Sequence, residues 1–221
     1  MASRLPKRIQ TPKEERLNAL SHGVGLLLAL IFTPFLLSLA FGIGDFDLNL
    51  ACISFCLGMI LVYTSSTFYH LAKERRLKHK LQKADHISIY FLIAGSYSPL
   101  VLGILERDKA LLFLGILWFL VILGTLFKLF FIGRFRFVSV ALYLGMGWMS
   151  VIIFRSMWDK FPGDIIFWIA LGGLFYTVGV FFYVQSKKLY YHAIWHLFVL
   201  GGTASHFMAI WLALENPALF S

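Results

Sequence analysis

The sequence predicts an all-α integral membrane protein, folded as a bundle of seven transmembrane helices. Of its 221 residues, 59% are hydrophobic and 14% are charged, whereas about 25% of the residues in a soluble domain are charged. The mean hydropathy is +0.78. Seven apolar segments each have about the length that crosses roughly 30 Å of hydrocarbon. Helix is the only spanning form that fits, because each segment must satisfy its own backbone hydrogen bonds and alternating strands are absent from the sequence.

The expected spans follow one another with short connections. They cover residues 19–41, 49–70, 86–105, 110–131, 137–154, 164–185 and 192–214. A basic segment precedes the first span, as in a secretory signal, but this span is longer than the apolar core of a signal, so we expect it to be retained. Turn-forming residues between spans, such as GIGD at 42–45 and FPGD at 161–164, predict that consecutive helices are antiparallel neighbours.

Basic residues are distributed unevenly between the two ends of the predicted bundle. Sixteen Lys and Arg residues lie in the N-terminal tail and in the second, fourth and sixth connections, against four in the other connections. By the positive-inside rule, the N-terminus is expected in the cytoplasm and the C-terminus outside. This gives a cytoplasmic basic tail at 1–18, a membrane domain at 19–214 and a short external tail at 215–221. The net charge of +9 is divided among short clusters, which argues against nucleic-acid binding.

Two histidines near the start of the last span have the spacing of a metal site. His192 and His196 are four residues apart, which on an α-helix places both imidazoles on one face, about 6 Å apart. One interpretation is a pair of transition-metal ligands, with Zn²⁺ as the best match. The other is a pair of interfacial histidines that hydrogen-bond to lipid headgroups or to each other. Cys52 and Cys56 are the only cysteines, and within an apolar run we interpret them as packing residues.

The predicted topology brings further polar residues to the same depth as this pair. His70 ends the second span, Asp85 opens the third span at the same end of the bundle, and His192 opens the seventh there too. Polar and ionisable groups near the hydrocarbon usually face the bundle interior and mark a site. If the second, third and seventh spans are adjacent, three histidines and one carboxylate can form a single site.

Ser66 and Asp85 are candidate catalytic residues, and each has a structural alternative. Ser66 lies one turn before His70 on the same helix face. Its hydroxyl can position a water molecule or a substrate carbonyl, or it can bond back to a carbonyl of its own helix. Asp85 can orient a ligand or a water molecule, or it can be the N-cap of the third span.

The other four histidines are expected to have less direct roles. His22, in the first span, is expected to be structural or to support a ligand, because three imidazoles already leave the open position that a catalytic zinc needs. His206 lies about 15 Å beyond His196 along the helix, as a core residue or as part of a substrate cavity. His79 and His86 lie in or beside the basic second connection and are expected to be solvated.

Four stretches of the sequence together resemble the bacterial hemolysin III family. They are EERLNALSHGVG at 14–25, SSTFYH at 65–70, KADHISIYFLIAGSYSPL at 83–100 and HAIWHLFVLGGTASH at 192–206. The pattern S-x-x-x-H, then Asp, then H-x-x-x-H in the last span is specific to this group. The family is related to the progestin and adipoQ (adiponectin receptor-like) receptors, within a wider group of membrane hydrolases that includes alkaline ceramidases. The predicted fourth to sixth spans resemble the family only in their hydrophobicity.

The resemblance implies a seven-helix bundle in a bacterial plasma membrane, with its N-terminus in the cytoplasm. It also implies a zinc ion held by His70, His192 and His196, with Asp85 and Ser66 near the zinc-bound water. Related receptors have ceramidase-like activity, so the expected function is zinc-dependent intramembrane hydrolysis of a lipid amide or ester, linked to membrane lipid homeostasis. Two alternatives stay open: a membrane-lytic protein, as the family name suggests, and a zinc-stabilised lipid-sensing receptor without turnover.

Overall fold

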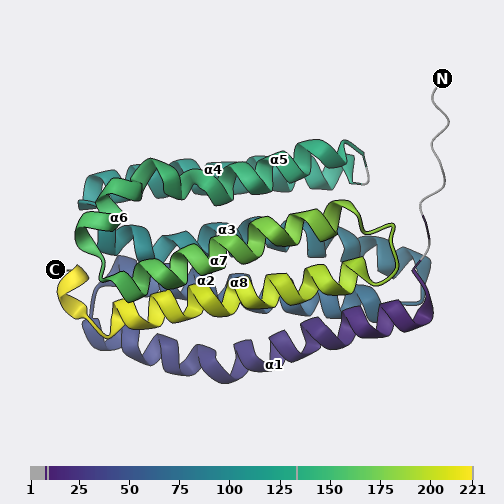
Figure 1. The fold of residues 1–221 in the computed structure, drawn as a ribbon, viewed down its shortest axis with the longest axis horizontal. Coiled ribbons are helices and arrows are strands. Elements are labelled where there is room, and N and C mark those ends of the chain that lie inside the picture. The colour runs from purple at the N-terminus through teal and green to yellow at the C-terminus, as the bar shows by residue number, and fades with distance from the viewer. Residues whose placement is uncertain (1–7, 9, 133, 221) are drawn as a thin grey trace.

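The computed structural model describes residues 8, 10–132 and 134–220, and among these residues it contains helices and no β-strand. The long helices are α1 (Pro12–Ile43), α2 (Phe46–Leu71), α3 (Arg75–Ile104), α4 (Arg107–Phe131), α7 (Gly163–Val184) and α8 (Tyr191–Leu214). The fifth span consists of α5 (Arg136–Gly147), the 3₁₀ helix η1 (Trp148–Ile153) and α6 (Phe154–Lys160), and the short 3₁₀ helix η2 (Pro217–Phe220) follows α8. Seven apolar helices are long enough to cross a membrane, which confirms the predicted fold class. They lie side by side, with the start of α1 and the end of α8 at opposite ends of the bundle (Figure 1).

The first helix begins at Pro12 rather than at residue 19, because Thr11 and Glu14 form a capping box. The Glu14 N–H donates to Thr11 Oγ1 at 3.3 Å, and the Thr11 N–H donates to the Glu14 carboxylate at 2.9 Å. Pro12 occupies the first helical turn, where a backbone N–H is not needed. The polar residues before the predicted first span therefore belong to α1 and extend it at one end of the bundle.

The third helix begins at Arg75 rather than at residue 86, so of the two alternatives for Asp85 the N-cap is wrong. The N-cap is Glu74, and Asp85 lies buried inside the helix. Residues 75–85 contain neither Gly nor Pro and are mostly good helix formers such as Arg, Lys, Leu and Gln. The helix therefore continues past the apolar segment that marked its expected start, and it carries most of the basic residues expected in the second connection.

The packing order brings α2, α3 and α8 into one group with α1. Helices α1 to α4 pack in chain order, α7 packs against α8, and α8 also contacts α1 and α3 (Figure 1). Helices α2 and α3 approach closely at Gly58 and Gly95, where an added Cβ would lie 3.0 Å from the Leu92 Cα and 2.8 Å from the Phe55 Cα, respectively. Small residues permit such close helix contacts in membrane proteins. This packing brings together the C-terminal end of α2, the N-terminal end of α8 and the first turns of α3.

The fifth span is packed less tightly and forms one wall of a cavity. Its helical geometry changes to 3₁₀ in η1, where Tyr97 of α3 holds the backbone. The Tyr97 hydroxyl donates to the Gly147 carbonyl at 2.5 Å and accepts from the Ser150 N–H at 2.8 Å. A cavity of about 550 Å³ lies between this span and helices α3, α7 and α8.

Candidate metal centre

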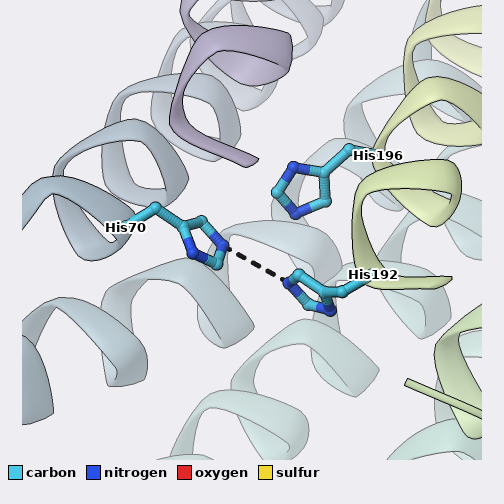
Figure 2. A group of neighbouring side chains, drawn as sticks. All are labelled: His70, His192 and His196. Atoms are coloured by element: carbon cyan, nitrogen blue, oxygen red, sulfur yellow. Dashed lines mark hydrogen bonds between the residues drawn. The ribbon is translucent and has the colours of Figure 1, made fainter. Parts of the chain in front are cut away.

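Three histidines from two helices converge at one end of the bundle. His70 comes from the last turn of α2, and His192 and His196 come from the first two turns of α8. One nitrogen of each ring lies within 4.8 Å of the corresponding nitrogens of the other two, an arrangement that could hold a metal ion. Figure 2 shows the three rings facing a common space. Two of the three, His70 and His196, are buried.

The distance between two of the ring nitrogens fits a tetrahedral metal ion. The Nε2 atoms of His70 and His192 are 3.3 Å apart, and two nitrogens bound to one tetrahedral zinc at about 2.0–2.1 Å stand about 3.3–3.4 Å apart. The His196 Nε2 is buried and has no hydrogen-bond partner among the described residues, which is costly for a polar atom unless a ligand occupies it. Three imidazoles suit zinc and several other divalent transition metals. The residues present therefore fit a bound metal ion.

Residues of α1 contact the Nδ1 atoms of two of these rings and so orient them. The Glu15 carboxylate lies 2.6 Å from the His70 Nδ1, and the Asn18 backbone carbonyl lies 3.2 Å from the His196 Nδ1. Both oxygens only accept hydrogen bonds, so in each ring Nδ1 carries the hydrogen and Nε2 is left with its lone pair toward the common space. The Ser21 hydroxyl, 3.1 Å from the His196 Nδ1, also donates to the Asn18 carbonyl at 2.9 Å.

A buried carboxylate fixes the start of α8, two residues before His192. Glu14 is 2% exposed and accepts a hydrogen bond from the Tyr190 N–H at 3.0 Å. Tyr190 is the N-cap of α8 and has a left-handed backbone with φ of 63°, a conformation that non-glycine residues adopt at a cost. Arg8 pairs with Glu14 at 2.6 Å and donates to the Lys187 carbonyl at 3.3 Å. Arg8 thus links Glu14 of α1 to the connection that precedes α8.

The sequence interpretation named His22 as a supporting residue but missed Glu15 and Asn18, although a signal for them exists. Glu15, Asn18 and His22 follow one another at helical spacing on one face of a predicted span. Ionisable and amide groups in such a segment usually face the bundle interior. Only the structure shows which of them reaches which histidine.

Replacing Glu15 by Gln tests its role in orienting His70. The neutral amide can still accept a hydrogen bond but no longer favours one tautomer, so we expect metal affinity to fall about 10- to 100-fold, the usual effect of losing such a partner. A chelator competition on the purified variant measures the affinity. The matched control is Glu106→Gln, because Glu106 is 76% exposed and forms an i, i+3 ion pair with Lys109 away from the histidines. Equal affinities for wild type and both variants would show that Glu15 does not support the site.

The structure places Asp85 and Ser66 beside the histidine group. Asp85 is 4% exposed and interacts electrostatically with His70 of α2 and Lys128 of α4. Ser66 is fully buried and lies close enough to interact with the Asp85 carboxyl group, but within residues 8, 10–132 and 134–220 its hydroxyl makes no hydrogen bond of normal geometry. It therefore does not bond back to its own helix, unlike Ser65, which donates to the Val62 carbonyl at 3.3 Å.

The remaining histidines lie outside the group of three. His22 stacks on His196 with ring centroids 3.6 Å apart and an angle of 11° between the rings, and it is buried. His206 lines the cavity. His79 is exposed, as expected. His86, which was expected to be solvated, is half-buried, and its Nδ1 lies 3.1 Å from the Nζ of the buried Lys128.

The cavity connects the neighbourhood of the histidines with the opposite half of the bundle. Asp85 and His22 line it at the histidine end, and Ile104 and Met157 line it at the far end. Most of its other lining side chains are aliphatic or aromatic. Its volume lies within the range of about 300–1,000 Å³ that is typical of small-molecule sites. The histidine group therefore adjoins an elongated apolar space.

Comparison with known proteins gives consistent relatives over most of the chain. The family model described as Haemolysin-III related matches residues 10–207. The hemolysin-3 homolog of Bacillus subtilis (strain 168) is 39% identical over 90% of this chain and 94% of its own length. Hemolysin-3 of Bacillus cereus is 34% identical over 95% of this chain and 96% of its own length. The human monocyte to macrophage differentiation factor is 30% identical over 74% of this chain and 71% of its own.

Proposed function

The chain belongs to the haemolysin-III-related family of multi-pass bacterial membrane proteins, and on this premise we propose that it is a zinc-dependent hydrolase of a membrane lipid amide or ester. The observation that carries the proposal is that the three histidines lie beside Asp85 and His22, which line one end of an apolar cavity. A metal that only stabilised the fold would not need this adjoining space. A hydrolase needs both a polar reaction centre and room for the apolar part of its substrate.

His70, His192 and His196 are the proposed zinc ligands. Three protein ligands leave a fourth position open, which distinguishes catalytic from structural zinc sites. When bound, zinc polarises a carbonyl oxygen and lowers the pKa of a water molecule toward about 7. The thiol groups of Cys52 and Cys56 lie on α2 among the buried apolar residues of the core, so they take no part in this ligand set.

Asp85 and Ser66 are the proposed catalytic residues. The Asp85 carboxylate accepts a proton from the attacking water and returns it to the departing nitrogen or oxygen as the carbonyl carbon–heteroatom bond breaks. The Ser66 hydroxyl, which is buried beside the Asp85 carboxyl group, donates to the oxygen on which negative charge develops. His22 stacks on the ring of His196 and supports this proposed ligand by packing. The products are a carboxylic acid and an amine or alcohol.

A lipid substrate follows from the shape and chemistry of the cavity. An acyl chain fits an elongated space lined mainly by apolar side chains, and its carbonyl group would then lie at the Asp85 end. Burial of each methylene contributes about 0.8 kcal/mol, so the cavity can supply the affinity while the polar end performs the chemistry. A small polar substrate would gain little from such a space.

Filling the cavity at Gly173 tests whether it holds the substrate chain. Gly173 of α7 lines the cavity, and a Cβ added there meets no atom within 4 Å. We expect Gly173→Phe to reduce turnover of long-chain lipids about tenfold or more while short-chain substrates and metal content are unaffected, because the phenyl ring occupies the space of the chain. Gly115→Phe on α4 is the matched control, since Gly115 also has open space around it but does not line the cavity. Equal loss of activity toward all chain lengths would contradict this assignment.

Turnover separates the hydrolase from a receptor in which zinc is structural. The purified, zinc-supplied protein is incubated with ceramides, other N-acyl lipids and acyl esters, and the released fatty acid is measured. We expect release from at least one class, and its loss when the metal is stripped and return when zinc is restored. A folded, zinc-loaded protein that releases no fatty acid from any of these lipids would favour a lipid-sensing role.

A further inference from the structure

A polar groove separate from the cavity lies where α2 ends and α3 begins. It has a volume of about 400 Å³, and its lining residues are Tyr69, Arg75, Lys78, His79 and Gln82. The four residues from α3 are spaced i, i+3, i+4 and i+7, so they form one face of the first two turns of the helix, opposite Tyr69 of α2. The groove is therefore a product of regular helix geometry rather than of a loop.

The floor of the groove is held in place by hydrogen bonds. Lys78 Nζ donates to the Tyr69 carbonyl at 3.1 Å and pairs with the Glu15 carboxylate at 3.0 Å. It also lies 4.8 Å from the centroid of the Tyr69 ring. Gln82 donates to the Tyr69 hydroxyl at 3.4 Å. Lys78, Gln82 and Tyr69 thus form a fixed polar surface.

The rim of the groove carries donors that are available to a ligand. Arg75 and His79 are exposed, and within the described part of the chain neither side chain has a hydrogen bond or an ion pair. No acidic side chain lines the groove. A guanidinium group presents several N–H donors in the planar arrangement that matches the oxygens of a phosphate. The groove is therefore suited to an anion, and a phosphate matches the arginine best.

The position of the groove indicates the source of that phosphate. Tyr69 lies two residues before the end of α2, and the apolar part of α3 begins only after residue 85. The groove therefore lies at the level where a transmembrane helix leaves the hydrocarbon, on the end that the distribution of Lys and Arg predicts to be cytoplasmic. Basic pockets between transmembrane helices at this level bind anionic lipid headgroups. We propose that this groove binds the phosphate of an anionic phospholipid.

The proposed lipid site borders the metal centre without being part of it. Lys78 in the groove pairs with one oxygen of the Glu15 carboxylate, and the other oxygen of that carboxylate contacts His70. A lipid phosphate bound at the rim therefore lies near a carboxylate that orients a proposed metal ligand. The proposal does not depend on hydrolysis, because it rests on the groove alone.

Native mass spectrometry of the full chain tests the proposal with two neighbouring variants. The detergent-solubilised protein is titrated with phosphatidylglycerol and, separately, with phosphatidylcholine. We expect one phosphatidylglycerol to be retained in preference to phosphatidylcholine, and Arg75→Gln to weaken its binding about fivefold, the effect of one basic residue at an anionic surface. Arg76→Gln removes the same charge from the next position of α3, which does not line the groove, and should change binding less than twofold. Equal losses in both variants would show diffuse surface charge and overturn the proposal.

Inorganic phosphate distinguishes a lipid from a soluble ligand. The expected result is that it displaces phosphatidylglycerol from the wild type only at a large excess, because the lipid is also anchored by its acyl chains. Arg75-dependent binding of inorganic phosphate without binding of phosphatidylglycerol would identify a soluble-anion site and overturn the lipid assignment. Absence of any preference for phosphatidylglycerol over phosphatidylcholine would also overturn it.

Discussion

Replacing His196 by Ala is expected to abolish metal binding and, with it, hydrolysis. The side chain is fully buried, its Nε2 has no partner within the described protein, and its Nδ1 is already engaged by α1. Removing one of three imidazole ligands should lower metal affinity on the order of 10³-fold, since each ligand supplies a substantial share of the binding free energy of a zinc site. Metal content is measured on the purified variant beside the wild type, together with fatty-acid release.

The control for this experiment is Lys80→Ala, which truncates an exposed side chain outside the group of three and outside the groove between α2 and α3. It should retain both metal and turnover. The His196→Ala cavity can also destabilise the bundle, so thermal unfolding of both variants is recorded. A His196→Ala protein that is folded and still binds metal with wild-type affinity would contradict the assignment of this residue as a ligand.

Replacing Asp85 by Asn is expected to separate catalysis from metal binding. Asn keeps the size of the side chain but cannot accept the proton of a water molecule, so turnover should fall about 10²-fold or more. Metal content should persist, because Asp85 is not among the three grouped ligands. The measurement is kcat and KM for fatty-acid release from whichever lipid the wild type cleaves, with the loss expected in kcat.

Asp108→Asn provides the matched control for Asp85→Asn. Asp108 is exposed in the first turn of α4, at the other end of the bundle, so its replacement should leave turnover unchanged. Asp85 also interacts with the buried Lys128, and a mere loss of stability would lower kcat and metal content together. Unchanged turnover in Asp85→Asn would remove this residue from the mechanism.

The spans and the histidine group could be predicted because both follow from local patterns in the sequence. Each span is a run of apolar residues of membrane-crossing length, and the i, i+4 spacing of His192 and His196 fixes their common face. The depth of His70 follows from the end of its apolar run. The grouping of these three residues required only that their helices be neighbours, and α1 completes that neighbourhood by contacting both α2 and α8.

Features that depend on long-range packing could not be predicted from the sequence. The extension of α3 back to Arg75 was not predicted, because hydropathy detects only the part of a helix that lies in the hydrocarbon. The contacts of Glu15 with His70 and of Asn18 with His196 join residues more than 50 positions apart. The cavity depends on how loosely the fifth span packs against α3 and α7, which no local pattern in that apolar segment records.

The metal content of the wild-type protein tests the central claim most directly. The full chain is purified in detergent with zinc available, unbound metal is removed, and zinc is quantified by elemental analysis against protein concentration. The arrangement of His70, His192 and His196 predicts about one zinc ion per chain. A folded wild-type protein that retains no zinc under these conditions would contradict the metal centre and the hydrolase function built on it.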